Sequence, residues 1–179
     1  MKSFLLAVWE VLEVVLVAVV TVFLIRNFLM QPFLVSGASM EPNFGSGNYL
    51  IIDEITYRLR DPQRGEVIVF KYPDNPSTYY IKRIIGLPGE KVEIRKGSVY
   101  ITNNNSPEGF IIKEDYLPLE LKTSGNTSVK LSDQDYFVLG DNRNYSYDSR
   151  SWGTLPRENI IGLARLRLLP VTKVQAFSY

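Results

Sequence analysis

The chain opens with a long apolar stretch and then changes to short runs in which hydrophobic and polar residues alternate. Between Phe4 and Ile25 the residues are almost all apolar, and only Glu10 and Glu13 carry charge. The stretch has about the 20 residues that a helix needs to cross a bilayer. We therefore predict a transmembrane helix over about residues 8–28, with both glutamates near one membrane interface.

Two other interpretations of this stretch stay open, namely a helix buried in a soluble core and a cleaved signal peptide. Against the signal peptide, Lys2 alone would form the basic region, and no small-residue cleavage site follows the apolar run. The flanking charges do not fix an orientation, because Lys2 before the helix is balanced by Arg26 after it.

After Gln31-Pro32 the helical pattern is lost, because proline disfavours helix at the residue before it. Short hydrophobic runs follow, and turn-forming Gly, Pro and Asn residues separate them. One pair predicts a hairpin, since Val92 and Ile94 alternate with charged residues before the turn at Lys96-Gly97. The predicted strands are 49–52, 66–70, 79–85, 91–94, 98–101, 135–139 and 160–166.

This pattern predicts a mainly β fold, with a coiled antiparallel sheet or barrel-like domain after one N-terminal transmembrane helix. We divide the chain into a membrane anchor over residues 1–30 and a β-rich domain over 31–179. Residues 102–130 are rich in Asn, Ser, Thr and Gly, and we expect them to form an exposed excursion or small subdomain between two core strands.

The composition restricts the chemistry, because the chain has no histidine and no cysteine. A Ser-His-Asp triad, a Cys-His pair, disulfides and zinc sites of the His/Cys type are excluded. Any catalytic base must be Lys, Asp, Glu, Tyr or a terminal amine. With 20 basic and 19 acidic residues the net charge is +1, which does not favour a nucleic-acid partner.

A first polar cluster is SGASMEP at residues 36–42. Small residues surround Ser39, and Gly37 allows backbone angles that other residues avoid. The segment therefore has the composition of a tight turn that exposes one hydroxyl group. The alternative is an ordinary Ser/Gly turn that follows the membrane helix.

A second cluster is YIKRIIGLPGE at residues 80–90, where two cations interrupt an apolar strand. Alternation places Lys82 on the face of Tyr80 and Arg83 on the face of Ile81, so at least one cation points to an apolar side. Burial lowers the pKa of a lysine, and a neutral amine is a competent general base. The alternative is an edge strand with two solvated charges.

A third cluster, GDNRNYSYDSRSWG at residues 140–153, follows a strand that ends at Leu139. Such a density of polar groups indicates a loop bonded to itself, although a plain surface loop or a cation site also fits. Residues 141, 142 and 144 do not have EF-hand spacing. Together the clusters supply a nucleophile, a base other than histidine and an orienting hydroxyl, which is the Ser-Lys variant of a catalytic triad.

In these stretches the chain resembles the bacterial type I signal peptidases, membrane-bound Ser-Lys endopeptidases that remove signal peptides. The matching motifs are SGASMEP at 36–42, RGEVIVF at 64–70, YIKRIIGLPGE at 80–90 and GDNRNYSYDSRSWG at 140–153. The resemblance extends from the N-terminal helix to about residue 170, and 102–130 lies outside any motif. Signal peptidases of the endoplasmic reticulum and archaea use histidine in place of the lysine, so a chain without histidine resembles the bacterial kind.

The resemblance implies that Ser39 is the nucleophile, that Lys82 is the general base and that the Ser146 hydroxyl positions the lysine amine. The backbone N–H of Ser39 would be one oxyanion-hole donor. Some family members complete that hole with a serine two residues earlier. Here that position is Gly37, so the second donor is left open.

The resemblance also implies supporting ion pairs and an apolar substrate pocket. The ion pairs would join Asp141 to Arg83 and Asp148 to Arg150, and the pocket walls would be Phe33, Val35 and Ile81. The expected partners are signal-peptide-bearing preproteins and the lipid bilayer, with no cofactor, metal or nucleic acid. The chain would cross the plasma membrane once, with a cytoplasmic N-terminus and the catalytic domain on the outer face.

Two other classes of protein compete with this interpretation. A catalytically inactive, membrane-tethered β module would need a broken dyad, and none is visible. A self-cleaving Ser-Lys protein of the repressor type would need a DNA-binding segment upstream, where this chain has a single apolar helix.

Overall fold

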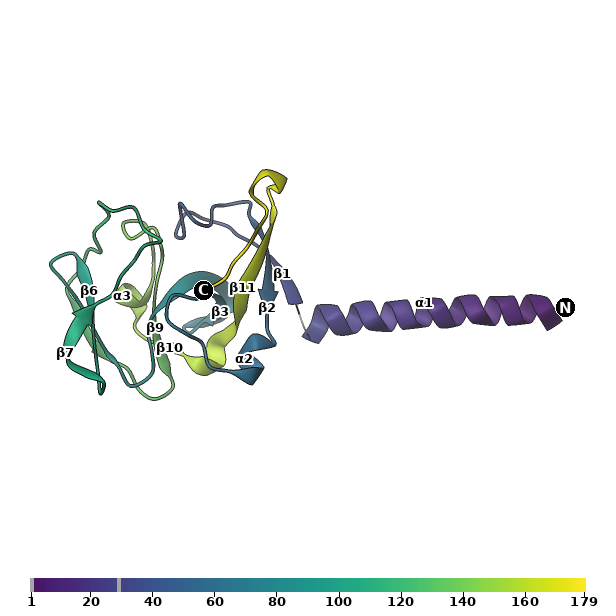
Figure 1. Ribbon diagram of the computed structural model, residues 1–179, viewed down its shortest axis with the longest axis horizontal. Coiled ribbons are helices and arrows are strands. Elements are labelled where there is room, and N and C mark those ends of the chain that lie inside the picture. Colours follow the sequence, from purple (N-terminus) through teal and green to yellow (C-terminus); the bar gives the residue numbers. More distant parts are fainter. Residues whose placement is uncertain (1, 29) are drawn as a thin grey trace.

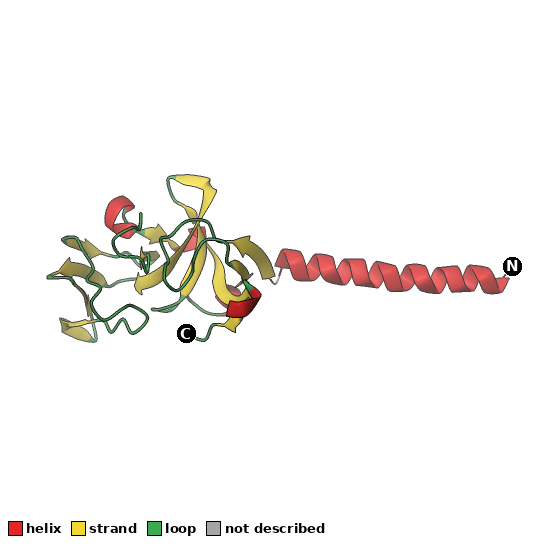
Figure 2. Ribbon diagram, turned by 90° about the horizontal axis from the view of Figure 1, so that it is seen from above, coloured by secondary structure: helices red, strands yellow, loops and turns green. Residues whose placement is uncertain are grey.

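A computed structural model describes residues 2–28 and 30–179, which form one long helix and a β-rich domain (Figure 1). Helix α1 covers Lys2–Phe28 and extends away from the domain, as a view from above also shows (Figure 2). The helix predicted over about residues 8–28 is therefore present and begins earlier. Within the described residues, no helix combines the length and the apolar character of a membrane span.

A large sheet of eight strands forms the part of the domain next to α1, and its strand pairs are antiparallel. The strand order is β1-β2-β11-β3-β4-β9-β10, and β12 pairs with β11. Strand β11, from near the C-terminus, thus lies between β2 and β3. The strands are β1 (Met30–Leu34), β2 (Tyr49–Asp53), β3 (Val67–Tyr72), β4 (Asn75–Gly86), β9 (Asp135–Leu139), β10 (Leu155–Pro156), β11 (Ile160–Leu169) and β12 (Gln175–Ala176).

A second sheet of four antiparallel strands lies at the end of the domain farthest from α1, in the order β7-β6-β5-β8 (Figure 1). Its strands are β5 (Lys91–Arg95), β6 (Ser98–Asn103), β7 (Ser106–Ile111) and β8 (Thr127–Lys130). Short helical turns join some of the strands, namely α2 (Thr56–Leu59), α3 (Ser149–Trp152), η1 (Arg157–Asn159) and η2 (Val171–Lys173).

Every strand predicted from the hydrophobic pattern is present, and the prediction of a mainly β, antiparallel fold is confirmed. The order of the large sheet has two ends, at β1 and β10, so among the described strands two sheets are a better description than a barrel. Residues 102–130, expected as an excursion, supply β7 and β8, which flank the β5–β6 hairpin. Strand β1 was not predicted, and its Pro32 is tolerated because β1 is an edge strand.

The core explains why the β3 sequence is a continuous hydrophobic run. Ile68 and Phe70 point into one hydrophobic cluster, and Val67 and Val69 point into another on the opposite face. Because residues 67–70 of β3 are covered on both sides, this part of the strand has no solvent-facing position that favours a polar residue. A third cluster fills the space between the small sheet, β4 and β9. Strand β4 therefore enters the core after its exposed first half, and Lys82 and Arg83 lie in its buried half.

Candidate active site

Ser39 lies in the loop that connects β1 to β2. The side chains of Met40 and Phe44 are buried, and a backbone bridge joins these two residues, so the turn is anchored directly after the serine. Gly37 has φ of 98°, a left-handed conformation that favours glycine. Ser39 itself is half-buried, which leaves its hydroxyl accessible from one side.

Lys82 approaches Ser39 from β4, although the two residues are 43 positions apart. Its Nζ donates a hydrogen bond to Ser39 Oγ at 2.7 Å and another to the Ile81 carbonyl at 2.9 Å. Strand β4 pairs with β3 on one side and β9 on the other, and Lys82 is only 3% exposed. The alternative of an edge strand with solvated charges is therefore wrong.

Burial lowers the pKa of Lys82 to about 8, because an ammonium group loses hydration in the core. The negative charges of Asp148 and Asp141 oppose this shift without cancelling it. The amine is consequently neutral in a substantial fraction of molecules at mildly alkaline pH. This state is the one that accepts a proton.

Ser146 lies close to the backbone of Ser39, but in the described residues its buried hydroxyl has no hydrogen-bond partner. Its position is fixed by packing against Gly140, where an added Cβ would stand 2.1 Å from Ser146 Oγ and 2.4 Å from the Ser39 carbonyl oxygen. The role of Ser146 in orienting Lys82 stays a prediction, since the structure does not join the two by a hydrogen bond.

The residues expected to form ion pairs lie within hydrogen-bond distance of each other. Arg83 donates two bonds to Asp141, from Nε to Oδ1 at 2.8 Å and from Nη2 to Oδ2 at 2.6 Å, and both side chains are buried. Arg150 donates two bonds of 2.8 Å to Asp148, which also accepts from the Gly140 N–H at 3.0 Å. Burial acts to lower the pKa of Arg83, but its hydrogen bond with Asp141 and the charge of Asp141 raise it overall, so the cation persists.

Two segments meet at this site, namely residues 140–149 after β9, here called the 140–149 loop, and the turn around Ser39 between β1 and β2, here called the Ser39 turn. The sequence did not identify the residues that join them. The backbone N–H of Asn142 donates to the Ser39 carbonyl and its side chain donates to the Ala38 carbonyl, both at 3.0 Å. Asn43 donates to Asp141 Oδ2 at 2.8 Å. The only sequence signal for these contacts was the polar density of the loop, which does not indicate partners distant along the chain.

A small cavity of about 130 Å³ opens beside Ser39 and Lys82. The three predicted pocket residues contribute to its lining, which consists of Phe33, Leu34, Val35, Ser36, Ser39, Leu50, Val69, Tyr79, Tyr80, Ile81 and Lys82. A larger polar cavity of about 610 Å³, near Arg167 and Lys173, includes neither Ser39 nor Lys82 in its lining. Of these two cavities, only the smaller one is lined by Ser39 and Lys82. Among the described residues, no cluster of three acidic side chains is placed to hold a metal ion.

A serine hydroxyl beside a buried lysine of lowered pKa is the arrangement of serine hydrolases that use lysine as the base. Comparison with known proteins agrees with this class. The family model for signal peptidase, peptidase S26, matches residues 8–169, and the chain belongs to this family of serine peptidases. The resemblance inferred from the motifs is thereby confirmed.

The most similar relatives include two probable signal peptidases I of Synechocystis sp. The first, I-2, is 40% identical over 173 residues, which cover 92% of this chain and 75% of the relative. The second, I-1, is 36% identical, and the match covers 92% of this chain and 84% of the relative. Signal peptidase I P of Bacillus subtilis subsp. natto is 30% identical, and the match covers 92% of this chain and 90% of that relative. A crystal structure of a signal peptidase I from Enterococcus faecalis aligns with a TM-score of 0.48 and 32% identity, over 58% of this chain and 97% of that one.

Proposed function

We propose that this chain removes signal peptides from secreted preproteins, with Ser39 as nucleophile and Lys82 as general base. The observation that carries the proposal is the 2.7 Å contact between Lys82 Nζ and Ser39 Oγ, made by a lysine that is almost fully buried. Membership of the signal peptidase family supports the substrate class.

The reaction proceeds by acyl transfer. Neutral Lys82 takes the proton from Ser39 Oγ as the oxygen attacks the carbonyl carbon of the scissile peptide bond. The ammonium then gives that proton to the leaving nitrogen, the C–N bond breaks, and an ester to Ser39 remains. Lys82 then takes a proton from a water molecule, whose oxygen attacks the ester carbon. The bond from that carbon to Ser39 Oγ breaks, and the Lys82 ammonium returns its proton to Oγ. The Ile81 carbonyl accepts one N–H of Lys82 and so orients the amine. In the neutral amine the bond to Ser39 is reversed, and the lone pair of Nζ accepts the serine proton.

The oxyanion formed in this reaction needs preorganised donors. The backbone N–H of Ser39 is one candidate. Gly37 has no side chain that could supply a hydroxyl, so we propose a backbone N–H or a water molecule as the second donor.

The cavity suggests how the substrate binds. Its lining comes largely from the end of β1 and from residues 79–82 of β4. Strand β1 lies at the edge of the sheet and pairs with β2 on one side, which leaves a backbone edge for an extended peptide. Small side chains at the P1 and P3 positions fit the limited apolar volume beside Phe33, Val35 and Ile81.

A cleavage assay with a purified preprotein tests this proposal. We expect kcat/KM to fall about tenfold per pH unit below an apparent pKa near 8 and to level off above it, because protonated Lys82 cannot accept the serine proton. The pH profile and the N-terminus of the released mature chain are the measurements. A profile that stays flat between pH 6 and 9 would count against Lys82 as the base.

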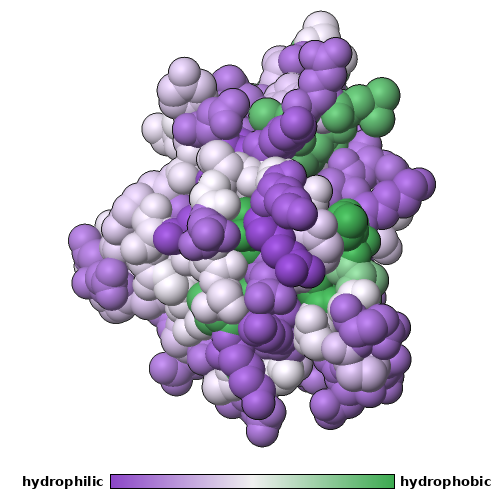
Figure 3. All heavy atoms as spheres, turned by 90° about the vertical axis from the view of Figure 1, so that its left-hand side faces the viewer, coloured by the Kyte–Doolittle hydropathy of each residue, from purple (hydrophilic) through white to green (hydrophobic). Residues whose placement is uncertain are grey.

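Although no helix of the described residues combines the length and the apolar character of a membrane span, we also propose that α1 anchors the enzyme in the plasma membrane, with the N-terminus in the cytoplasm and the domain on the outer face. In support, the large apolar side chains between Val8 and Phe23 are exposed on all sides of the helix, by 40% to 69%. At about 1.5 Å per residue, the helix is also roughly 40 Å long. The face of the domain opposite the helix is mainly hydrophilic (Figure 3), which suits contact with water.

Charges placed in the middle of α1 test the anchor. We expect the double variant Val15→Arg with Val19→Arg to leave the membrane fraction on alkaline washing, because each arginine at a bilayer centre costs about 3 kcal/mol. Cleavage of a short soluble peptide should be unchanged. In the matched control Val8→Arg, the charge can reach an interface and the protein should stay in the membrane. Equal retention of the double variant and the control would argue against a membrane span.

A further inference from the structure

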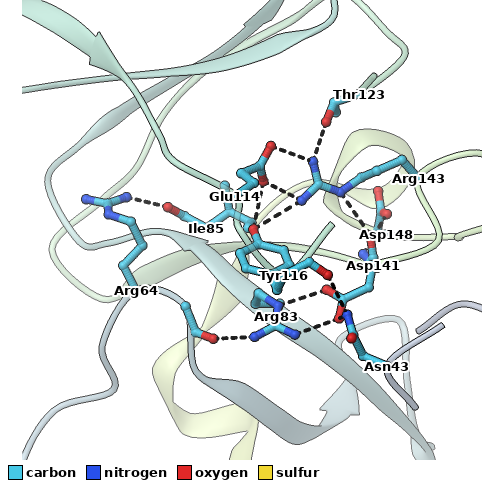
Figure 4. A network of polar contacts seen from close by, with 12 residues as sticks. Asn43, Arg64, Arg83, Ile85, Glu114, Tyr116, Thr123, Asp141, Arg143 and Asp148 are labelled. Atoms are coloured by element: carbon cyan, nitrogen blue, oxygen red, sulfur yellow. Dashed lines mark hydrogen bonds and ion pairs between the residues drawn. The ribbon is translucent and has the colours of Figure 1, made fainter. Parts of the chain in front are cut away.

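Residues 112–126 connect β7 to β8 and have no role in the mechanism above. A connection of this length with no helix or strand of its own is uncommon in a compact domain and is often functional. Part of it is directed inward. Glu114, Tyr116 and Thr123 contact residues of β4 and of the 140–149 loop, as the close view shows (Figure 4).

Tyr116 contacts the Arg83–Asp141 ion pair. The guanidinium carbon of Arg83 lies 3.9 Å from the centre of the tyrosine ring, which is close stacking. The Tyr116 carbonyl accepts a hydrogen bond of 2.9 Å from Asn43 Nδ2, and the same Nδ2 donates to Asp141. A single residue of the segment is therefore connected to β4, to the 140–149 loop and to the loop that carries Ser39.

Glu114 compensates the charge of a second buried arginine. The side chain of Arg143 has no exposed surface, and its Nη1 donates to Glu114 Oε2 at 3.1 Å and also to Thr123 Oγ1. Its Nε donates to the Gly140 carbonyl at 3.0 Å. Tyr116 joins the cluster, because its hydroxyl donates to Glu114 Oε1 at 2.7 Å. Without Glu114, a buried cation on the 140–149 loop would lose its salt-bridge partner, and such a loss is strongly destabilising.

Small movements of this loop matter because of its packing at Gly140. That residue lies so close to Ser146 Oγ and to the Ser39 carbonyl that there is no room for one methyl group. Because Arg143 Nε donates to the Gly140 carbonyl, a shift of Arg143 would move Gly140 and so displace Ser146 and Ser39. Misplacement of catalytic groups by about 1 Å can cost about 100-fold in rate.

We propose that Glu114 and Tyr116 are positioning residues of the catalytic site, through which the 112–126 segment holds the 140–149 loop and β4 in register with Ser39. This inference rests on the proposed Ser39–Lys82 mechanism. If the inference holds, residues 112–126 affect kcat itself, whereas a purely structural role would change only the fraction of folded molecules.

The test compares variants of the full-length enzyme in detergent with a peptide substrate. For Tyr116→Ala we expect kcat to fall roughly 10- to 100-fold while KM changes less than about threefold. The apparent pKa of the pH profile should rise, because a looser loop admits water to Lys82 and relieves its desolvation. Glu114→Gln should change kcat and the apparent pKa in the same directions, whereas Tyr116→Phe, which keeps the ring over Arg83, should retain most of the activity.

The matched controls are Lys113→Ala and Asp115→Ala, because these neighbours are 85% and 71% exposed and pair with each other. Both should behave as wild type. Thermal unfolding of each variant shows the fraction folded at the assay temperature.

Two results would overturn the inference. One is kcat for Tyr116→Ala and Glu114→Gln within twofold of the controls. The other is a loss of kcat that matches the fraction unfolded, with an unchanged apparent pKa. Ser39→Ala, assayed in parallel, separates the two proposals. Full activity of that variant would refute the mechanism, whereas an inactive Ser39→Ala beside a fully active Tyr116→Ala would refute the positioning role alone.

Discussion

Replacing Ser39 by alanine is expected to lower kcat for preprotein cleavage on the order of 10⁶-fold, and Lys82→Ala should cause a comparable loss. In the proposed mechanism the two residues act as one unit, because the hydroxyl is a weak nucleophile unless the amine at 2.7 Å removes its proton. The double variant should therefore be no less active than either single variant. Cleavage is measured by the appearance of mature protein, and circular dichroism confirms that the variants are folded.

The matched control is Ser46→Ala, since Ser46 is an exposed serine in the same loop. It should leave kcat unchanged. Normal processing by Ser39→Ala or Lys82→Ala, or losses that multiply in the double variant, would show that Ser39 and Lys82 do not form a catalytic pair.

The second large effect is expected for Gly140→Ala. The new Cβ would lie 2.1 Å from Ser146 Oγ and 2.4 Å from the Ser39 carbonyl oxygen, far inside van der Waals contact. Since one of these atoms belongs to the backbone, a change of side-chain rotamer cannot relieve the overlap, and the Ser39 turn has to move. We expect kcat/KM to fall at least about 100-fold, together with a lower melting temperature.

Gly45→Ala is the control for this effect, because the nearest atom to a Cβ there is 3.6 Å away, an ordinary contact distance. Its kcat/KM and melting temperature should stay close to those of the wild type. Should Gly140→Ala retain kcat/KM within about threefold, the packing between the 140–149 loop and the Ser39 turn would not control catalysis.

Hydrophobic patterning, either as alternation or as a continuous apolar run, was sufficient to predict the longer strands that have at least one buried face. Strands β7 and β8 were missed because they have partly or fully exposed side chains and no buried face to impose a pattern. Strand β1 was missed because Pro32 argues against a strand unless its position at a sheet edge is known. In each case the missing information was the identity of the neighbouring strand.

The site shows the same limit. Lys82 and Ser39 were recognisable because each interrupts its surroundings, one as a charge in an apolar run and the other as a hydroxyl among small residues. The contacts of Glu114 with Arg143 and of Asn43 with Tyr116 could not be recognised from the sequence. They join ordinary polar residues that are 29 and 73 positions apart, respectively. Charge and hydrogen-bonding capacity do not identify a partner until the fold brings it near.

The position of β11 determines when this enzyme can first become active as it is synthesised. The Ser39 turn lies between β1 and β2, and in the sheet β2 is joined to β3 and β4 through β11. Residues 160–169 must therefore leave the ribosome before the large sheet can hold Ser39 and Lys82 beside each other. A nascent chain that lacks them contains Ser39 and Lys82 but not the strand that joins their two parts of the sheet, so we expect no proteolytic activity before β11 has been made.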